Sequence, residues 1–262
     1  MRLLRASVLK LGRRPATYRT LLVVAGLLAF IYLSIGLSAA AMSDPSARAS
    51  IEVLLAPPDA YGGLASILLI FGGMAGAGYA WAVAASEWSW NTFRMALTRG
   101  ESRVRYTVVL FLAIGLLVLA AWILLYLFGV GLTRVGATLG GVASGSLLDA
   151  TNLGALTAIM VAGGWGVLME VAVGFCVAFA SRSPVAGIAT VAGLYFIEQF
   201  AALVVPADVL RFAPVTAAGS LVSAAGQTGL GAGLAGPLVV TTVYLLVAIG
   251  AAAAVARRSQ VP

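Results

Sequence analysis

The sequence predicts an all-α integral membrane protein with six transmembrane helices, from its composition and the pattern of its apolar segments. Hydrophobic residues make up 61% of the 262 residues and charged residues only 10%, whereas a soluble domain has about 45–50% apolar and about 25% charged residues. Six apolar windows have the roughly 20 residues that a helix needs to cross the hydrocarbon core. Helices are expected, because backbone groups facing lipid must be hydrogen-bonded within their own segment. The windows are Thr20–Ala41, Leu64–Ser86, Thr107–Leu132, Gly154–Ala180, Pro184–Val205 and Ala235–Ala256.

The positions of the basic residues predict that both termini are cytoplasmic, because cytoplasmic loops carry an excess of Lys and Arg. All basic residues except Arg48, Arg134 and Arg211 lie before the first window, between the second and third, between the fourth and fifth, or after the sixth. This placement accounts for the net charge of +7 without nucleic acid as a partner. Abundant Ala, Gly and Arg are typical of a bacterial chain, so we expect a multi-pass protein of the bacterial cytoplasmic (inner) membrane, in contact with lipid.

Residues 1–19 form a basic amphipathic segment. Leu4, Val8 and Leu11 recur at helical spacing, with arginines on the opposite face. The pattern predicts a cytoplasmic helix that lies at the membrane surface before the first span. The alternative is a signal peptide cleaved among the small residues 37–43, but the long basic tail and the long apolar run favour an uncleaved span.

Residues 87–105, EWSWNTFRMALTRGESRVR, gather charge between the second and third windows. Trp90, Phe93 and Leu97 share one helical face, which is typical of a short helix at the headgroup level. A cytoplasmic loop held by its aromatic residues explains the arginines. It does not explain Glu87 at the start of the loop, so a structured loop that docks a second protein is the other interpretation.

Two acids interrupt the spans. A charged side chain at the bilayer centre costs about 2.5–3.5 kcal/mol, so Glu170 and Glu198 should face the bundle or a cavity. With Gln199 they are candidates for a polar substrate path or a proton-accepting site. The alternative is a protonated carboxyl group that is hydrogen-bonded to a neighbouring helix and serves only packing.

Residues 206–234 precede the last window and are apolar but interrupted by Pro206, Pro214 and several glycines. We expect short helices that face outward and can re-enter the outer leaflet.

Several kinds of chemistry are missing from the sequence. There is no histidine, and the single cysteine, Cys176, lies in an apolar run. We find no metal cluster, no nucleophile–base pair, and no G-x-x-x-x-G-K-[ST] loop that would bind the phosphates of a nucleotide. The chain is therefore not expected to be an enzyme, and we assign it no catalytic residue, no metal and no bound cofactor.

Glu87, Thr92, Arg94, Leu97 and the pair Ser102–Arg103 resemble the pattern of ABC type-2 export permeases, the membrane subunits of ATP-binding cassette exporters. In that family a Glu ends the second span, a Thr-x-Arg and a Leu follow, and Ser-Arg opens the third. The lysine that members often carry early in the third span is missing from Tyr106–Leu110.

The resemblance implies that residues 87–105 are a coupling helix, that residues 1–19 are an interfacial elbow helix, and that residues 206–234 close the outer end of a pathway. The implied contacts with an ATPase subunit are Glu87, Asn91, Thr92, Arg94, Leu97, Ser102 and Arg103. The implied second cytoplasmic contact is Ser181, Arg182 and Ser183.

The family also implies a function. The chain would be one permease of a homodimer or a related heterodimer, and a separate ATPase subunit would bind ATP and Mg²⁺. The dimer would export its substrate by alternating access, and the apolar spans favour an amphipathic or hydrophobic substrate. Two alternatives stay open: an ion-gradient-driven carrier that uses Glu170, and a non-transporting membrane anchor or sensor subunit.

Overall fold

The structure is a computed structural model that describes residues 2–89, 95, 98, 100–143, 145, 149–181, 183 and 185–258. All regular structure among these residues is helical. The helices are α1 (Arg2–Gly12), α2 (Pro15–Ala41), α3 (Pro45–Leu55), α4 (Asp59–Ser89), α6 (Arg103–Gly140), α7 (Ala150–Ser181), α8 (Ala186–Ala201), α9 (Ala207–Leu210), α10 (Pro214–Thr228), η1 (Ala232–Leu234) and α11 (Ala235–Arg258).

Among the described residues, five helices are long and apolar enough to cross a membrane: α2, α4, α6, α7 and α11. By helix length and hydropathy the chain is a multi-pass membrane protein. The remaining predicted window, Pro184–Val205, contains only the 16-residue α8. At 1.5 Å per residue this helix is about 24 Å long, shorter than the ~30 Å hydrocarbon core. The apolar run continues to Val205, but α8 ends at Ala201 and the chain turns before Pro206.

The five long helices extend beyond their apolar windows, and two of them extend into the predicted coupling segment. α4 begins at Asp59 and ends at Ser89, so Glu87 belongs to it. α6 begins at Arg103, so this arginine also lies in a long helix. The two ends of the predicted coupling segment 87–105 are therefore helical, and its role towards a partner stays a prediction.

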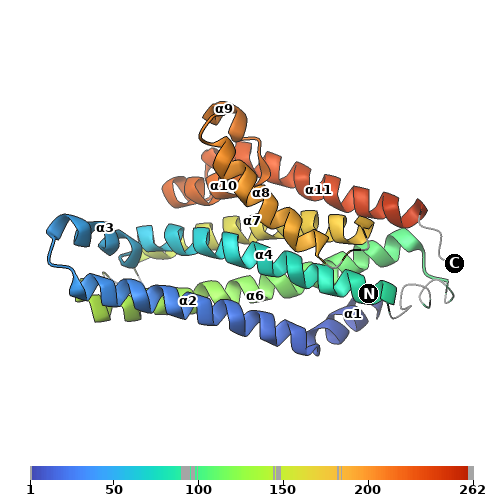
Figure 1. Cartoon of the computed structure of the whole chain (residues 1–262), viewed down its shortest axis with the longest axis horizontal. Helices are drawn as coiled ribbons and strands as arrows, with labels where there is room; N and C mark the ends of the chain where they lie inside the picture. Colours follow the sequence, from blue (N-terminus) through green and yellow to red (C-terminus); the bar gives the residue numbers. More distant parts are fainter. Residues whose placement is uncertain are drawn as a thin grey trace.

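The bundle is built around α4 and α7, which lie side by side (Figure 1). α2 and α6 pack together on one flank, and α8, α10 and α11 cover the other. α1, the end of α4, the start of α6 and the end of α11 lie at one end of the bundle, which we name the basal end, and α3 lies at the opposite end (Figure 1).

The N-terminal segment forms a helix, α1, as its periodicity predicts. Its apolar face packs on the protein: Leu11 is fully buried, and Leu4 and Val8 contact the core. α1 lies against the basal part of α6. α1 is thus attached to the bundle as well as being amphipathic.

Glycines set the distance between α2 and α6. A Cβ atom built on Gly36 would lie 2.6 Å from the carbonyl oxygen of Gly136, and one built on Gly136 would lie 2.9 Å from the carbonyl oxygen of Tyr32. The two backbones are therefore in contact, as small residues permit in membrane helix pairs.

We expect Gly136→Leu to lower the free energy of unfolding by about 1–3 kcal/mol, because overpacking forces the helices apart. Gly131→Leu, on the same helix, is the matched control, since a Cβ atom there meets nothing within 4 Å. The measurement is the thermal unfolding midpoint of both variants in detergent. Equal midpoints for the two variants would show that the α2–α6 contact is not tight.

Candidate functional site

Glu87 lies near the basal end of α4, and its side chain is only 1% exposed. Three partners surround the carboxylate. Lys10 of α1 donates from Nζ to Oε1 at 2.7 Å, and the hydroxyl of Tyr106, on α6, donates to Oε2. Arg14, at the start of α2, places Nη2 3.6 Å from Oε1.

Arg14 extends the network to a fifth side chain, because its Nη1 donates to Ser86 Oγ at 2.8 Å. We name Glu87, Lys10, Arg14, Tyr106 and Ser86 the Glu87 cluster. It joins four elements at the basal end: α1, the start of α2, the end of α4 and the start of α6.

The burial of the Glu87 carboxylate is favourable only because of its partners. A buried carboxylate is costly unless it is paired and hydrogen-bonded. Glu87 has a cation at 2.7 Å and a hydroxyl donor on its second oxygen. The Lys10 side chain is 39% exposed, so it gives up less hydration than Glu87 does. The carboxylate therefore fixes α1, α4 and α6 relative to one another.

Sequence reasoning singled out Glu87 but missed its partners. The signal for Lys10 was present, since it is the one lysine in a chain whose other basic residues are all arginines. Tyr106 carried no such signal, because tyrosine is common where a span begins. Glu87 makes these contacts within the chain, and its predicted contact with an ATPase stays a prediction.

Only some of the other predicted coupling residues are among those that the structure describes. Asn91, Thr92, Arg94 and Leu97 fall outside the described residues. Ser102 is the N-cap of α6, and its Oγ accepts a hydrogen bond from the backbone N–H of Arg105 at 3.2 Å. This bond satisfies one of the free amides at the start of a helix.

The second predicted cytoplasmic contact lies where α7 ends. Ser181 is the last residue of α7 and is exposed. The backbone N–H of Ser183 donates to Ser181 Oγ at 3.3 Å, and Arg182 falls outside the described residues. The pair forms a local turn, and its role towards a partner stays a prediction.

Glu170 is buried where α4, α7 and α8 meet. The hydroxyl of Tyr195 donates to Oε1 at 2.7 Å. The other oxygen, Oε2, has no hydrogen-bond partner among the described residues. It lies against the backbone of Gly73, where a Cβ atom would be 1.5 Å away. A hydrogen bond to a neighbouring helix is what the packing interpretation expects, and an unpartnered oxygen leaves the proton-site interpretation open.

Glu198 has a structural partner that the sequence did not reveal. Its Oε1 accepts from the backbone N–H of Val215 at 3.0 Å, and its Oε2 accepts from the N–H and the Oγ1 of Thr216 at 2.7 and 2.9 Å. These donors lie in the first turn of α10, where backbone amides have no intrahelical acceptor and negative charge is favourable. Glu198 therefore caps α10 and ties it to α8. Gln199 is exposed on α8.

We expect Glu198→Ala to lower the free energy of unfolding by about 2 kcal/mol, because it removes a charged cap from three donors. Hydrogen exchange should become faster at the first amides of α10. Gln199→Ala is the control, because its side chain is exposed. If α10 exchanges equally slowly in both variants, the cap does not hold the helix.

Among the described residues, no group of three or more His, Cys, Asp or Glu side chains can hold a metal ion. No protein-family model matches the chain, and no curated protein matches it either. The resemblance to export permeases therefore rests on the sequence pattern alone, and it stays an expectation.

Proposed function

We propose that this chain is the transmembrane permease subunit of an ATP-driven exporter. A separate ATPase subunit, with ATP and Mg²⁺, would supply the energy, and two permease copies would form the path. The observation that carries the proposal is the Glu87 cluster. It joins the base of the charged loop to the N-terminal helix through a buried carboxylate.

The Glu87 cluster is arranged so that a force on the charged loop is transmitted to the helix bundle. The segment after Glu87 leaves α4, and the segment before Tyr106 enters α6, so a partner that pushes on this loop pushes on both helices. Glu87 and Tyr106 hold the two helix ends together, and Lys10 adds α1 to the same unit. Movement of a rigid unit at one end of a bundle is how a membrane transporter changes access.

The rest of the proposal follows from composition and charge. The spans are lined by apolar side chains, which favours an amphipathic or hydrophobic substrate. Most of the basic residues that the structure describes lie at the basal end, which we take as the cytoplasmic side of a bacterial inner membrane. The export direction follows from the family that the loop resembles.

The test is purification of the tagged chain from its own membranes in mild detergent, with its partners identified by mass spectrometry. We expect a chain with a G-x-x-x-x-G-K-[ST] motif to co-purify, and Arg94→Glu to abolish this. Arg258→Glu is the matched control, because it makes the same charge change on an exposed residue in the last turn of α11. Glu87 is unsuitable for this test, since a change there disturbs the bundle itself.

A second readout separates the alternatives. We expect inside-out vesicles with the co-purified ATPase to accumulate an amphipathic dye only when ATP is present. An ATPase that co-purifies without any ATP-dependent transport favours the anchor or sensor subunit. The absence of an ATPase from every preparation would overturn the proposal.

The second candidate is an ion-gradient-driven carrier, and the observation that favours it is the unpartnered buried oxygen of Glu170. A carrier that uses this acid loses proton-coupled transport in Glu170→Gln. An ATP-driven exporter keeps ATP-dependent transport in the same variant, because Gln preserves the shape and can still accept from Tyr195.

A further inference from the structure

A cavity of about 260 Å³ lies between α2, α4 and α6, and no residue of the Glu87 cluster lines it. Its walls are mainly apolar and include Leu21 of α2, Leu68 and Gly72 of α4, and Leu117 and Leu125 of α6. The cavity is not used by the proposed function.

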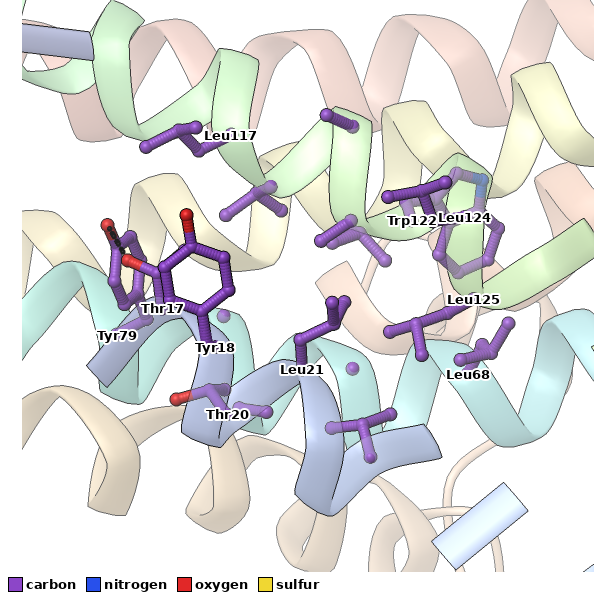
Figure 2. Close-up of a pocket in the computed structure, with 18 of the residues that line it drawn as sticks. Thr17, Tyr18, Thr20, Leu21, Leu68, Tyr79, Leu117, Trp122, Leu124 and Leu125 are labelled. Carbon is purple, nitrogen blue, oxygen red and sulfur yellow. Dashed lines mark hydrogen bonds between the residues drawn. The ribbon is translucent and has the colours of Figure 1, made fainter. Parts of the chain in front are cut away.

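The polar groups of the cavity gather at one end. Figure 2 shows the hydroxyl groups of Thr17 and Tyr79 together there, with Leu68, Leu125 and Trp122 at the other end. The two hydroxyl oxygens are 3.0 Å apart, and Thr17 Oγ1 also donates to the carbonyl oxygen of Leu11 at 2.8 Å. The cavity thus has a polar end near the junction of α1 and α2 and an apolar interior.

The cavity opens sideways, between α2 and α6. These helices are in backbone contact at Gly36 and Gly136, far from the basal end. At the cavity, Tyr18 of α2 and Leu124 of α6 are 58% and 60% exposed. In a protein that crosses the membrane, this opening faces the acyl chains of the surrounding lipid.

The depth of the cavity matches one leaflet. Tyr79 and Leu68 line opposite ends, and at 1.5 Å per residue they lie about 16 Å apart along α4. Half of the ~30 Å hydrocarbon core is about 15 Å. A lipid acyl chain that enters between α2 and α6 can therefore extend from the polar end of the cavity to its apolar end.

Two basic residues follow the lining residue Gly12 in the sequence. Gly12 lines the cavity, and Arg13 and Arg14 follow it at the junction. No acidic residue occurs before Asp44 in the chain. Arg13 is exposed. Basic residues next to a membrane surface attract anionic headgroups.

We propose that this cavity binds one acyl chain of an anionic phospholipid from the basal leaflet, with the headgroup at the α1–α2 junction. The chain fills the space between α2, α4 and α6, and Arg13 contacts the phosphate. The proposal does not depend on an ATPase partner, so the failure of either proposal leaves the other standing.

Trp122 lines the apolar end of the cavity, so a quencher on a bound acyl chain reports occupancy. The full chain is prepared with Trp122 as its one tryptophan and the other four replaced by Phe. Two of these, Trp81 and Trp165, have buried Nε1 atoms without a hydrogen-bond partner among the described residues, so Phe suits their sites. The protein is placed in phosphatidylcholine vesicles that contain increasing brominated phosphatidylglycerol, and brominated phosphatidylcholine is the reference lipid.

We expect brominated phosphatidylglycerol to quench Trp122 more strongly than its mole fraction predicts. The preference over phosphatidylcholine should be about fivefold for each basic residue that contacts the headgroup, and Arg13→Gln should reduce it. Quenching by brominated phosphatidylglycerol that only follows its mole fraction would overturn the proposal, and this result needs no cavity variant.

Gly72→Leu fills the cavity, because a Cβ atom there meets only Leu68, at 4.0 Å. We expect this variant to lose the preference for the anionic lipid. Gly26→Leu is the matched control, since Gly26 is an exposed position of α2 with nothing within 4 Å and does not line the cavity. The proposal is refuted if Gly72→Leu keeps its preference for phosphatidylglycerol while its unfolding midpoint equals that of Gly26→Leu. The lipid would then bind elsewhere on the protein.

Discussion

Glu87→Ala is expected to lower the free energy of unfolding by about 3 kcal/mol. Removing one partner of a buried ion pair typically costs about 3–5 kcal/mol, and we take the lower end because Lys10, which is 39% exposed, can be rehydrated. Arg14 and Tyr106 would each lose a partner inside the protein. The measurement is the unfolding midpoint of the purified chain in detergent, without any other protein present.

Glu52→Ala is the matched control for this effect. Glu52 pairs with Arg48 at 3.1 Å, but both side chains are more than a third exposed. An exposed pair at this helical spacing contributes about 0.3–0.5 kcal/mol. A Glu87 variant no less stable than the Glu52 variant would mean that the cluster does not hold the basal end together.

Tyr106→Phe separates hydrogen bonding from packing in the cluster. The aromatic ring stays, and only the hydroxyl that donates to Glu87 is lost. A hydrogen bond to a charged group contributes about 1.5–3 kcal/mol. We expect Tyr106→Phe to cost about half as much as Glu87→Ala, and the double variant to cost less than the two single changes added together.

Gly73→Ala is expected to lower the free energy of unfolding by about 3 kcal/mol, although it adds a single methyl group. That methyl carbon would lie 1.5 Å from Oε2 and 2.8 Å from Cδ of Glu170. The carboxyl group must move, and its hydrogen bond from Tyr195 then breaks inside a packed core. Overpacking and a lost buried hydrogen bond each contribute about 1–3 kcal/mol.

Two further variants test whether the effect of Gly73→Ala comes from the clash with Glu170. Gly72→Ala is the control, since the nearest atom to its Cβ is 4.0 Å away. Glu170→Ala should largely restore stability to Gly73→Ala, because it removes the two atoms nearest to the new methyl group, Oε2 and Cδ, and keeps Cβ, at 3.6 Å. If the double variant is less stable than Gly73→Ala, the clash is not with the Glu170 carboxyl group.

Much of the architecture was readable from local patterns. The apolar windows predicted the five long helices, because hydropathy over about 20 residues is a property of consecutive residues. The periodicity of residues 1–19 predicted a helix for the same reason, and α1 is that helix. The window at Pro184–Val205 is longer than α8, the helix that it contains, since hydropathy alone does not register where a helix gives way to turns.

The contacts of the candidate residues were not readable in this way. Sequence analysis identified Glu87, Glu170 and Glu198 as unusual, because an acid is out of place in or beside an apolar span. It did not identify the groups that each of them contacts. Their partners come from other helices: Lys10 is 77 positions from Glu87, Tyr195 is 25 from Glu170, and Val215 is 17 from Glu198.

The sequence by itself determined that this protein belongs in a membrane, where its long helices lie, and which of its acids stand in apolar surroundings, because each of these depends only on neighbouring residues. The tertiary structure alone decided that Glu87 ties the basal end together, that Glu198 caps α10, that Gly73 makes room for Glu170 and that α2 stands away from α6 to leave a cavity. The physical reason is that ion pairs, helix caps and close backbone approach join residues distant in the chain, and only the packing of the helices brings such residues within a few ångströms.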